Sequence, residues 1–135
     1  MKKIIIVDDH LLFREGIKLL IENEGFGKVV AEAENGKEFL ILLKTHQPDL
    51  VIMDIEMPFM NGLEATKIAV KAQPSLKVLV LTVMSEYTTD VEIRDAGAVG
   101  SVLKSSGKKE LEKAFRAILN GETYFKTKLN QNVLL

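Results

Sequence analysis

The chain has no cysteine, and none of its hydrophobic runs is long. Without cysteine it can form neither disulfides nor thiolate metal sites, so a metal ion would have to be held by oxygen atoms or by the two histidines. The aliphatic run that begins at Ile4 stops before Asp8, which is too short for a secretion signal, and no run approaches transmembrane length. We therefore expect a cytoplasmic protein that makes no contact with a membrane.

An excess of either charge is also missing, because 18 basic side chains stand against 19 acidic ones. Basic residues prevail only in residues 101–135, and a tail so short and so mildly charged does not make a nucleic-acid site. We expect no direct nucleic-acid binding by this chain. Its 135 residues, 47% of them hydrophobic and 27% charged, are typical of one globular domain.

Four short aliphatic runs each end at polar side chains that phosphoryl chemistry could use. These side chains are Asp8 with Asp9, then Asp54, Thr82 and Lys104. Unbroken aliphatic runs are typical of parallel strands that helices cover on both faces. Ligands of such sheets bind beyond the carboxyl ends of the strands. We therefore expect three carboxylates, a hydroxyl and an ammonium group in one crevice.

A stretch of helical periodicity follows each strand, so that strand and helix alternate five times. Parallel strands with helical crossovers connect right-handed, which predicts an α/β fold: a doubly wound (βα)₅ sandwich of flavodoxin-like topology with strand order 2-1-3-4-5. The predicted strands cover residues 4–7, 28–34, 49–54, 77–82 and 99–103. The predicted helices cover residues 11–24, 36–46, 62–73, 87–97 and 108–120.

The alternation is complete within residues 1–121, which we predict to be one domain. Residues 122–135 follow the fifth helix and end in three apolar residues. Two interpretations of this segment stay open: a short sixth helix that covers the apolar residues, or the start of a linker to another domain.

The three carboxylates would repel one another in the predicted crevice. At a separation of about 5 Å, each pair repels by roughly 3 kcal/mol at an effective dielectric near 20. A divalent cation cancels this repulsion, and Mg²⁺ fits best because it prefers oxygen ligands and is often completed by a phosphate oxygen. We predict that Asp8 and Asp9 hold the metal beside Asp54.

Asp54 is the best candidate for a nucleophile, since its strand lies in the middle of the sequence order and carboxylates form acyl phosphates. Lys104 would add a fixed positive charge, and Thr82 could give its hydroxyl to a phosphoryl oxygen. Taken singly, each residue also has an ordinary interpretation as a helix cap, strand filler or solvated surface residue. Their joint placement favours the functional interpretation.

The two histidines are not predicted to be catalytic. His10 is interpreted as a local polar or capping residue, with metal ligation as the lesser alternative. His46 lies in the last turn of a predicted helix, where a basic group suits the helix dipole.

Four motifs at these positions resemble those of the receiver domain of bacterial two-component response regulators. They read Ile-Val-Asp8-Asp9-His, Val-Ile-Met-Asp54-Ile-Glu-Met-Pro-Phe-Met-Asn-Gly, Val-Leu-Thr82 and Val-Leu-Lys104. The resemblance covers about residues 1–121 and implies a phosphorylation-dependent signalling switch. In such a switch a sensor histidine kinase transfers a phosphoryl group to the aspartate in the presence of Mg²⁺.

The resemblance also implies a role for each matching residue. Asp54 would be the phosphorylation site, and the acidic pair would bind Mg²⁺ together with Asp54 and the main-chain carbonyl of Glu56. Thr82 would be the switch hydroxyl, and Lys104 would bind the phosphoryl group. Such a protein is not an enzyme beyond its own phosphoryl acceptance and autodephosphorylation.

The end of the fifth helix and its sequel, Ala-Ile-Leu-Asn-Gly-Glu-Thr-Tyr-Phe, resemble the subfamily in which a LuxR-type helix-turn-helix DNA-binding domain follows the receiver. That output domain is not within the 135 residues. The resemblance therefore implies a piece of a transcription regulator, whose partners would be a kinase, the output domain and a second copy in a homodimer.

Three features depart from the family pattern or stand out within it. Ser101 occupies the position of the aromatic switch residue, and Val83 replaces a small residue and would narrow access to Asp54. The loop after Asp54 is apolar at Phe59 and Met60. Its residues either fold back onto the third helix or contact a partner.

Two other classes compete with the signalling interpretation. A phosphohydrolase of the haloacid dehalogenase type also uses an aspartate nucleophile, Mg²⁺ and a lysine, but its nucleophile should follow the first strand. A flavin-binding protein of the same topology would need a glycine-rich and hydroxyl-rich phosphate loop after the first strand, where this chain has acids.

Overall fold

Parallel strands form a sheet in the order β2-β1-β3-β4-β5-β6 in the computed structural model, which describes residues 1–83 and 89–125. The strands are β1 (Lys3–Val7), β2 (Lys28–Ala33), β3 (Leu50–Asp54), β4 (Val78–Thr82), β5 (Gly100–Leu103) and β6 (Tyr124–Phe125). The helices are α1 (Leu11–Asn23), α2 (Gly36–Leu42), α3 (Gly62–Ala72), α4 (Asp90–Asp95) and α5 (Lys108–Leu119), with a 3₁₀ turn at Lys104–Ser106. The predicted doubly wound fold and the order of its first five strands are confirmed.

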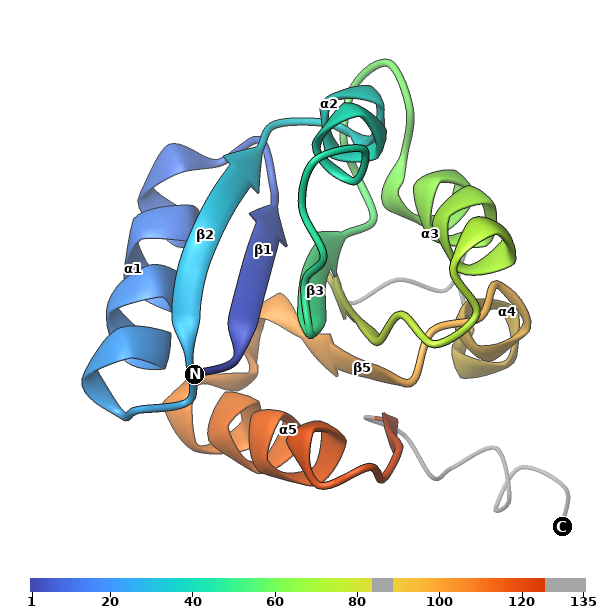
Figure 1. The fold of residues 1–135 in the computed structure, drawn as a ribbon. Coiled ribbons are helices and arrows are strands. Elements are labelled where there is room, and N and C mark those ends of the chain that lie inside the picture. Colours follow the sequence, from blue (N-terminus) through green and yellow to red (C-terminus); the bar gives the residue numbers. More distant parts are fainter. Residues whose placement is uncertain (84–88, 126–135) are drawn as a thin grey trace, which may run out of the picture.

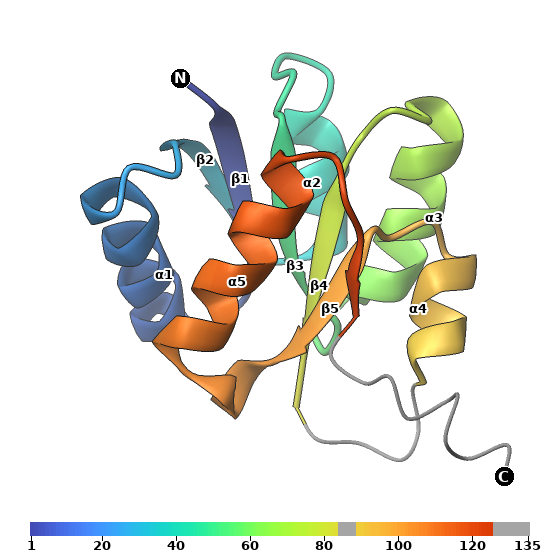
Figure 2. The ribbon, with the colours of Figure 1, turned by 90° about the horizontal axis from the view of Figure 1, so that it is seen from below.

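Helices cover both faces of the sheet, with α1 and α5 on one side and α2, α3 and α4 on the other (Figure 1 and Figure 2). Successive strand residues point to opposite layers: Ile4 and Ile6 pack with α1 and α5, whereas Ile5 and Val7 pack with the other three helices. Both sets are fully buried. This double burial explains why the strands are continuously aliphatic in the sequence.

The strand register brings the carboxyl ends of the central strands to one level. Val7 is paired with Met53, and Asp54 with Leu81, while Thr82 is paired with Leu103. The residues that follow or end β1, β3, β4 and β5 therefore lie at the same edge of the sheet. The sequence expectation of a shared edge is confirmed.

Two predicted helices differ in length from the observed ones. The regular part of α2 ends at Leu42, after which the amides of Lys44 and Thr45 donate to carbonyls three residues back, those of Ile41 and Leu42. The chain thus tightens over its last turn instead of continuing to residue 46 as α-helix. The described part of α4 is Asp90–Asp95, and the start predicted at residue 87 lies outside the described residues.

The short strand β6 was not predicted. Gly100 and Ser101 pair with Tyr124 and Phe125, and the Tyr124 hydroxyl donates a hydrogen bond to the Glu110 carboxylate. A two-residue strand has no periodicity of its own, which is why the sequence pattern does not reveal it. The rest of the predicted linker or sixth helix, residues 126–135, lies outside the described residues.

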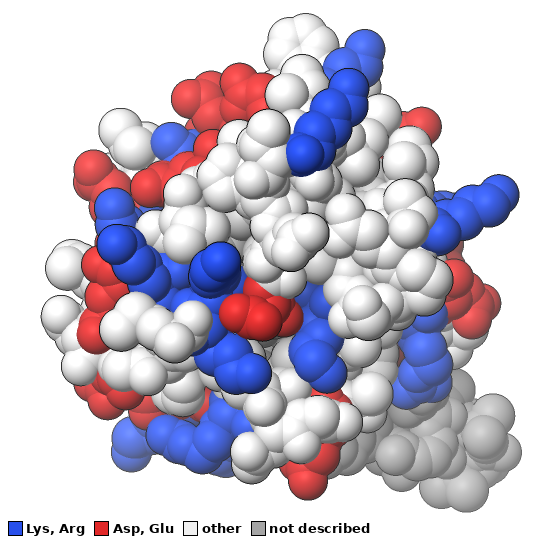
Figure 3. Space-filling view, in the orientation of Figure 1, with Lys and Arg blue, Asp and Glu red and all other residues white. Residues whose placement is uncertain are grey.

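The surface carries charge of both signs, and basic and acidic side chains are interspersed on the face seen in Figure 3. Among the helices of residues 1–83 and 89–125, none has the length and apolar character needed to cross a membrane.

Gly62 at the start of α3 is predicted to be irreplaceable, because a Cβ at this position would collide with the Asp54 carbonyl oxygen. Gly62→Ala should lower the free energy of unfolding by about 3 kcal/mol or more, since the main chain of β3 cannot move aside. Gly16→Ala is the matched control, because nothing lies within 4 Å of its Cβ position on α1. It should raise stability by about 0.5–1 kcal/mol. Urea unfolding of the two variants measures both effects, and equal stabilities would contradict the packing argument.

Candidate functional site

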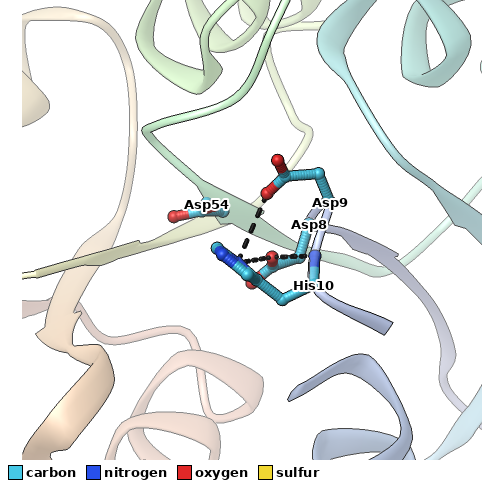
Figure 4. A group of neighbouring side chains, drawn as sticks. All are labelled: Asp8, Asp9, His10 and Asp54. Carbon is cyan, nitrogen blue, oxygen red and sulfur yellow. Dashed lines mark hydrogen bonds and ion pairs between the residues drawn. The ribbon is translucent and has the colours of Figure 1, made fainter. Parts of the chain in front are cut away.

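The sheet edge described above collects four acidic or basic side chains from three strand ends. Asp8 and Asp9 follow β1, Asp54 is the last residue of β3, and Lys104 directly follows β5. Ligand atoms of Asp8, Asp9, His10 and Asp54 all lie within 4.8 Å of one another (Figure 4). The structure thus brings together the predicted carboxylates and the predicted lysine.

Lys104 lies between the two buried carboxylates. Its Nζ is 2.8 Å from Asp8 Oδ2 and 3.6 Å from Asp54 Oδ2, and the side chains of Asp8 and Asp54 are only 1% and 3% exposed. The 2.8 Å contact is an ion pair that lacks hydrogen-bond geometry, and Asp54 Oδ2 makes no hydrogen bond within the described part of the chain. One ammonium group therefore offsets only part of the negative charge of the three acids.

The surroundings of Asp54 disfavour its ionised form. Burial, followed by the negative charges of Asp8 and Asp9, raises the pKa of Asp54, which comes to about 6. The Lys104 ammonium and the main-chain N–H of Glu56 act in the opposite direction and lower this pKa. The positive charge near Asp54 therefore does not fully compensate for burial and for the neighbouring acids.

The donor set at this edge fits a hard divalent cation such as Mg²⁺. It consists mainly of carboxylate oxygens, and one of them, Asp54 Oδ2, is buried and makes no hydrogen bond with the described residues. Glu56 is exposed and follows Asp54 by two residues. Its main-chain N–H donates a hydrogen bond to the Asp54 carboxylate. Its carbonyl stays a predicted ligand.

Thr82 ends β4 at the same edge and is buried, but its hydroxyl does not contact the acids. Its Oγ1 donates a 2.9 Å hydrogen bond to the Val83 carbonyl. The predicted use of this hydroxyl for a phosphoryl oxygen therefore requires it to leave Val83. Val83 is partly exposed and lines a hollow of about 600 Å³ together with His10 and Lys104.

His10 lies closer to the acids than its sequence interpretation suggests. It occupies the N-cap position of α1, yet its side chain makes no capping hydrogen bond. Its Nδ1 instead lies 2.9 Å from Asp8 Oδ1 and 3.3 Å from Asp9 Oδ1. The capping interpretation is wrong, because two carboxylates compete successfully for the ring.

Arg14 holds the main chain of the site in place, and the sequence reasoning missed it. It is buried, donates to the main-chain carbonyl of Asp8, and its Nε donates a 2.9 Å hydrogen bond to Glu32 on β2. It shares the buried stripe of α1 with Ile17 and Ile21. A charged residue within an apolar stripe was the available signal, because buried charges need partners.

Ser101 occupies the position where the resemblance predicts an aromatic residue, and it forms a buried polar pair with Asp90. The Ser101 hydroxyl on β5 donates a 2.7 Å hydrogen bond to Asp90 Oδ1 in the first turn of α4. Both residues are buried. This bond joins α4 to the sheet directly.

The apolar residues of the loop after Asp54 do not all behave alike: some are packed inward and one is exposed. Met57 and Met60 pack against the core, whereas Phe59 is 83% exposed and adopts a φ of 69°, which is uncommon for a residue other than glycine. The layer that Met60 packs against contains Ala65 of α3, so folding back onto the third helix is confirmed for Met60 and wrong for Phe59.

The raised pKa of Asp54 predicts a pH-dependent cost to stability. Between pH 4 and pH 6 the folded chain keeps a proton on Asp54 that the unfolded chain has released, so stability falls as pH rises through this window and then levels off. Asp54→Asn should therefore raise the free energy of unfolding by up to about 3 kcal/mol at pH 7.5 and by little at pH 4. Urea unfolding in EDTA measures this, with Asp95→Asn on exposed surface as the control. An equal effect at both pH values would show that the ionisation of Asp54 is not what lowers stability.

Comparison with known proteins agrees with this geometry. The family model of the response regulator receiver domain matches residues 4–116. A crystal structure of a LuxR-family two-component response regulator from Aurantimonas sp. SI85-9A1 superposes with a TM-score of 0.89 at 34% identity, covering 99% of this chain and 96% of that one.

Two curated relatives are longer than this chain. Response regulator GacA of Pseudomonas aeruginosa is 38% identical over 136 residues, which cover 100% of this chain and 63% of GacA. Transcriptional regulatory protein DegU of Brevibacillus brevis is 36% identical over 132 residues, which cover 98% of this chain and 56% of DegU. The chain thus spans less than two thirds of either relative. By its sequence and its fold, it belongs to the receiver-domain family of two-component response regulators.

Proposed function

We propose that this receiver accepts a phosphoryl group on Asp54 from a sensor histidine kinase and passes the change to an output domain. The observation that carries the proposal is the buried Asp54 carboxylate, which lies beside Asp8 and 3.6 Å from the Lys104 ammonium. An ionised carboxylate in these surroundings gains from a bound cation, which relieves the repulsion and also offsets the negative charge of an incoming phosphoryl group.

In the proposed transfer, an Asp54 oxygen attacks the phosphorus of a phosphohistidine. The new P–O bond forms as the P–N bond breaks, and the leaving imidazole nitrogen takes up a proton. Ionised Asp54 is the reactive form, so the groups that lower its pKa, Lys104 and the Glu56 N–H, favour the reaction.

Asp8, Asp9, Asp54 and the Glu56 carbonyl would hold Mg²⁺ in this site. When bound, the ion neutralises the negative charge of the phosphoryl oxygens during transfer. Lys104 already lies close to Asp8 and Asp54, and it would donate to a phosphoryl oxygen from this position. Arg14 holds the Asp8 main chain in place from α1.

The phosphoryl group adds charge at one end of the sheet, and we propose that Thr82 responds to it. Its hydroxyl would exchange the Val83 carbonyl for a phosphoryl oxygen and draw the end of β4 inward. The change would reach the face made by α4, β5 and α5, where the Ser101–Asp90 hydrogen bond links the first two elements.

The proposed output is transcriptional control by a DNA-binding domain that lies outside these 135 residues, and the proposed assembly is a homodimer. The name of DegU, a transcriptional regulatory protein, and the LuxR family of the Aurantimonas structure support the transcriptional part of the proposal. We also propose that the chain is a switch that loses its phosphoryl group by autodephosphorylation, rather than a classical enzyme.

Incubation with Mg²⁺ and acetyl phosphate should add one base-labile phosphoryl group to the chain, as measured by intact-mass spectrometry. Asp54→Asn should abolish the addition. Asp49→Asn is the matched control, because Asp49 is an exposed aspartate at the opposite end of β3 and should label normally. Labelling of the Asp54 variant would refute this acceptor, and sustained turnover of many phosphate esters would favour a hydrolase.

Thr82→Ala should separate labelling from the conformational response. The variant should still be labelled, because the hydroxyl is not the nucleophile, but the change in amide hydrogen exchange of α4 and β5 on adding beryllofluoride should shrink. Thr82→Ser keeps the hydroxyl and should behave like the native chain. If Thr82→Ala responded as fully as Thr82→Ser, the proposed role of the hydroxyl would be wrong.

A further inference from the structure

The imidazole of His10 lies among the proposed metal ligands. Its Nδ1 is 2.9 Å from Asp8 Oδ1 and 3.3 Å from Asp9 Oδ1 (Figure 4). The same nitrogen is 3.2 Å from Lys104 Nζ. The ring thus has the same carboxylate neighbour as the lysine. The phosphoryl transfer proposed above makes no use of it.

The backbone fixes this placement. The main-chain N–H of His10 donates a 2.8 Å hydrogen bond to Asp8 Oδ1, the same oxygen that Nδ1 approaches. Main chain and ring are therefore both fastened to Asp8. The side chain of His10 is nevertheless 63% exposed, so ions from solvent can reach it.

The spacing of these atoms suits ligands of one small ion. At bond lengths of roughly 2.0–2.2 Å, two ligands of one ion lie about 3.0 Å apart at right angles and about 3.4 Å apart at the tetrahedral angle that Zn²⁺ prefers. The distances of 2.9 Å and 3.3 Å from His10 Nδ1 to Asp8 and Asp9 are close to these values. A carboxylate oxygen of Asp54 lies within 4.8 Å of the ligand atoms of Asp8, Asp9 and His10, and Asp54 Oδ2 is buried and makes no hydrogen bond with the described residues.

The chemistry of an imidazole differs from that of the carboxylates around it. Mg²⁺ prefers oxygen ligands, whereas imidazole suits Zn²⁺, Cu²⁺ and Ni²⁺. A site of Asp8, Asp9 and Asp54 alone would favour the hard ion. Addition of one nitrogen ligand raises the affinity for the borderline ions without a matching gain for Mg²⁺.

We propose that His10 is a metal ligand that makes the acidic site of this receiver a binding site for a borderline divalent transition ion, held by Asp8, Asp9 and His10. This proposal rests on the proposed function in one respect, which is that Asp8 and Asp9 would also hold Mg²⁺. Because the two ions share these ligands, Zn²⁺ competes with Mg²⁺. Lys104 lies 3.2 Å from the same nitrogen and must move away when an ion binds there.

Titration calorimetry of the tag-free full chain tests the proposal, with Zn²⁺ and Mg²⁺ as separate probes. His10→Ala should weaken Zn²⁺ binding by about tenfold or more and change Mg²⁺ binding by less than about twofold. His46→Ala is the matched control, since His46 is the only other histidine and lies in the turn after α2, with Nδ1 3.0 Å from the Leu42 carbonyl. It should leave both affinities unchanged, and thermal unfolding of both variants checks that they fold.

Pulsed electron paramagnetic resonance with Cu²⁺ identifies the ligand directly, because the remote nitrogen of a bound imidazole modulates the echo. The native chain and His46→Ala should show this modulation, and His10→Ala should lose it. Persistence of the modulation in His10→Ala, or Zn²⁺ affinity equal to that of the native chain, would overturn the proposal.

The same measurements keep this proposal apart from the Mg²⁺ site. Mg²⁺ binding with no effect of His10→Ala on Zn²⁺ would refute the histidine ligand and leave the proposed function intact. Zn²⁺ binding that depends on His10 in a chain without Mg²⁺ affinity would support the ligand and refute the magnesium-dependent function.

Discussion

Repulsion between Asp8 and Asp54 at the carboxyl edge of the sheet is the interaction on which the site depends. Both side chains are almost completely buried, and burial removes the water that would screen their charges. Lys104 offsets part of this repulsion, and burial together with the neighbouring acids still raises the pKa of Asp54 to about 6. The site is therefore stabilised by whatever brings positive charge, such as a bound cation, or removes negative charge, such as a proton on Asp54.

The fold imposes this repulsion through its topology. Register places the ends of β1 and β3 side by side, Gly62 lets α3 start directly against the Asp54 main chain, and Arg14 fastens the turn after β1 to the sheet. None of these elements can move without disturbing a buried layer, so the carboxylates cannot separate to relieve their repulsion. In the proposed switch, the response to phosphorylation falls to groups that can change partner, such as the Thr82 hydroxyl, which donates to the Val83 carbonyl in this structure.

The sequence predicts most of the fold and the central acids for one physical reason: buried parallel strands must be aliphatic, so a polar residue at the end of such a run marks the functional edge. Features that depend on tertiary contacts were not predictable in this way. Strand β6 is too short to have a period, the hydrogen bond of Ser101 with Asp90 joins residues of two elements, and the ring of His10 prefers two carboxylates to the helix end. Arg14 alone left a visible signal, a charge within an apolar stripe.

The most direct measurement is a titration of the Asp54 carboxyl carbon by nuclear magnetic resonance, with and without Mg²⁺. Without the ion, the carboxyl should titrate with a pKa of about 6, and saturating Mg²⁺ should lower this pKa. A pKa near the ordinary value of 3.8 under both conditions would show that burial and the neighbouring acids do not disfavour the charged carboxylate as described, and would contradict the central claim.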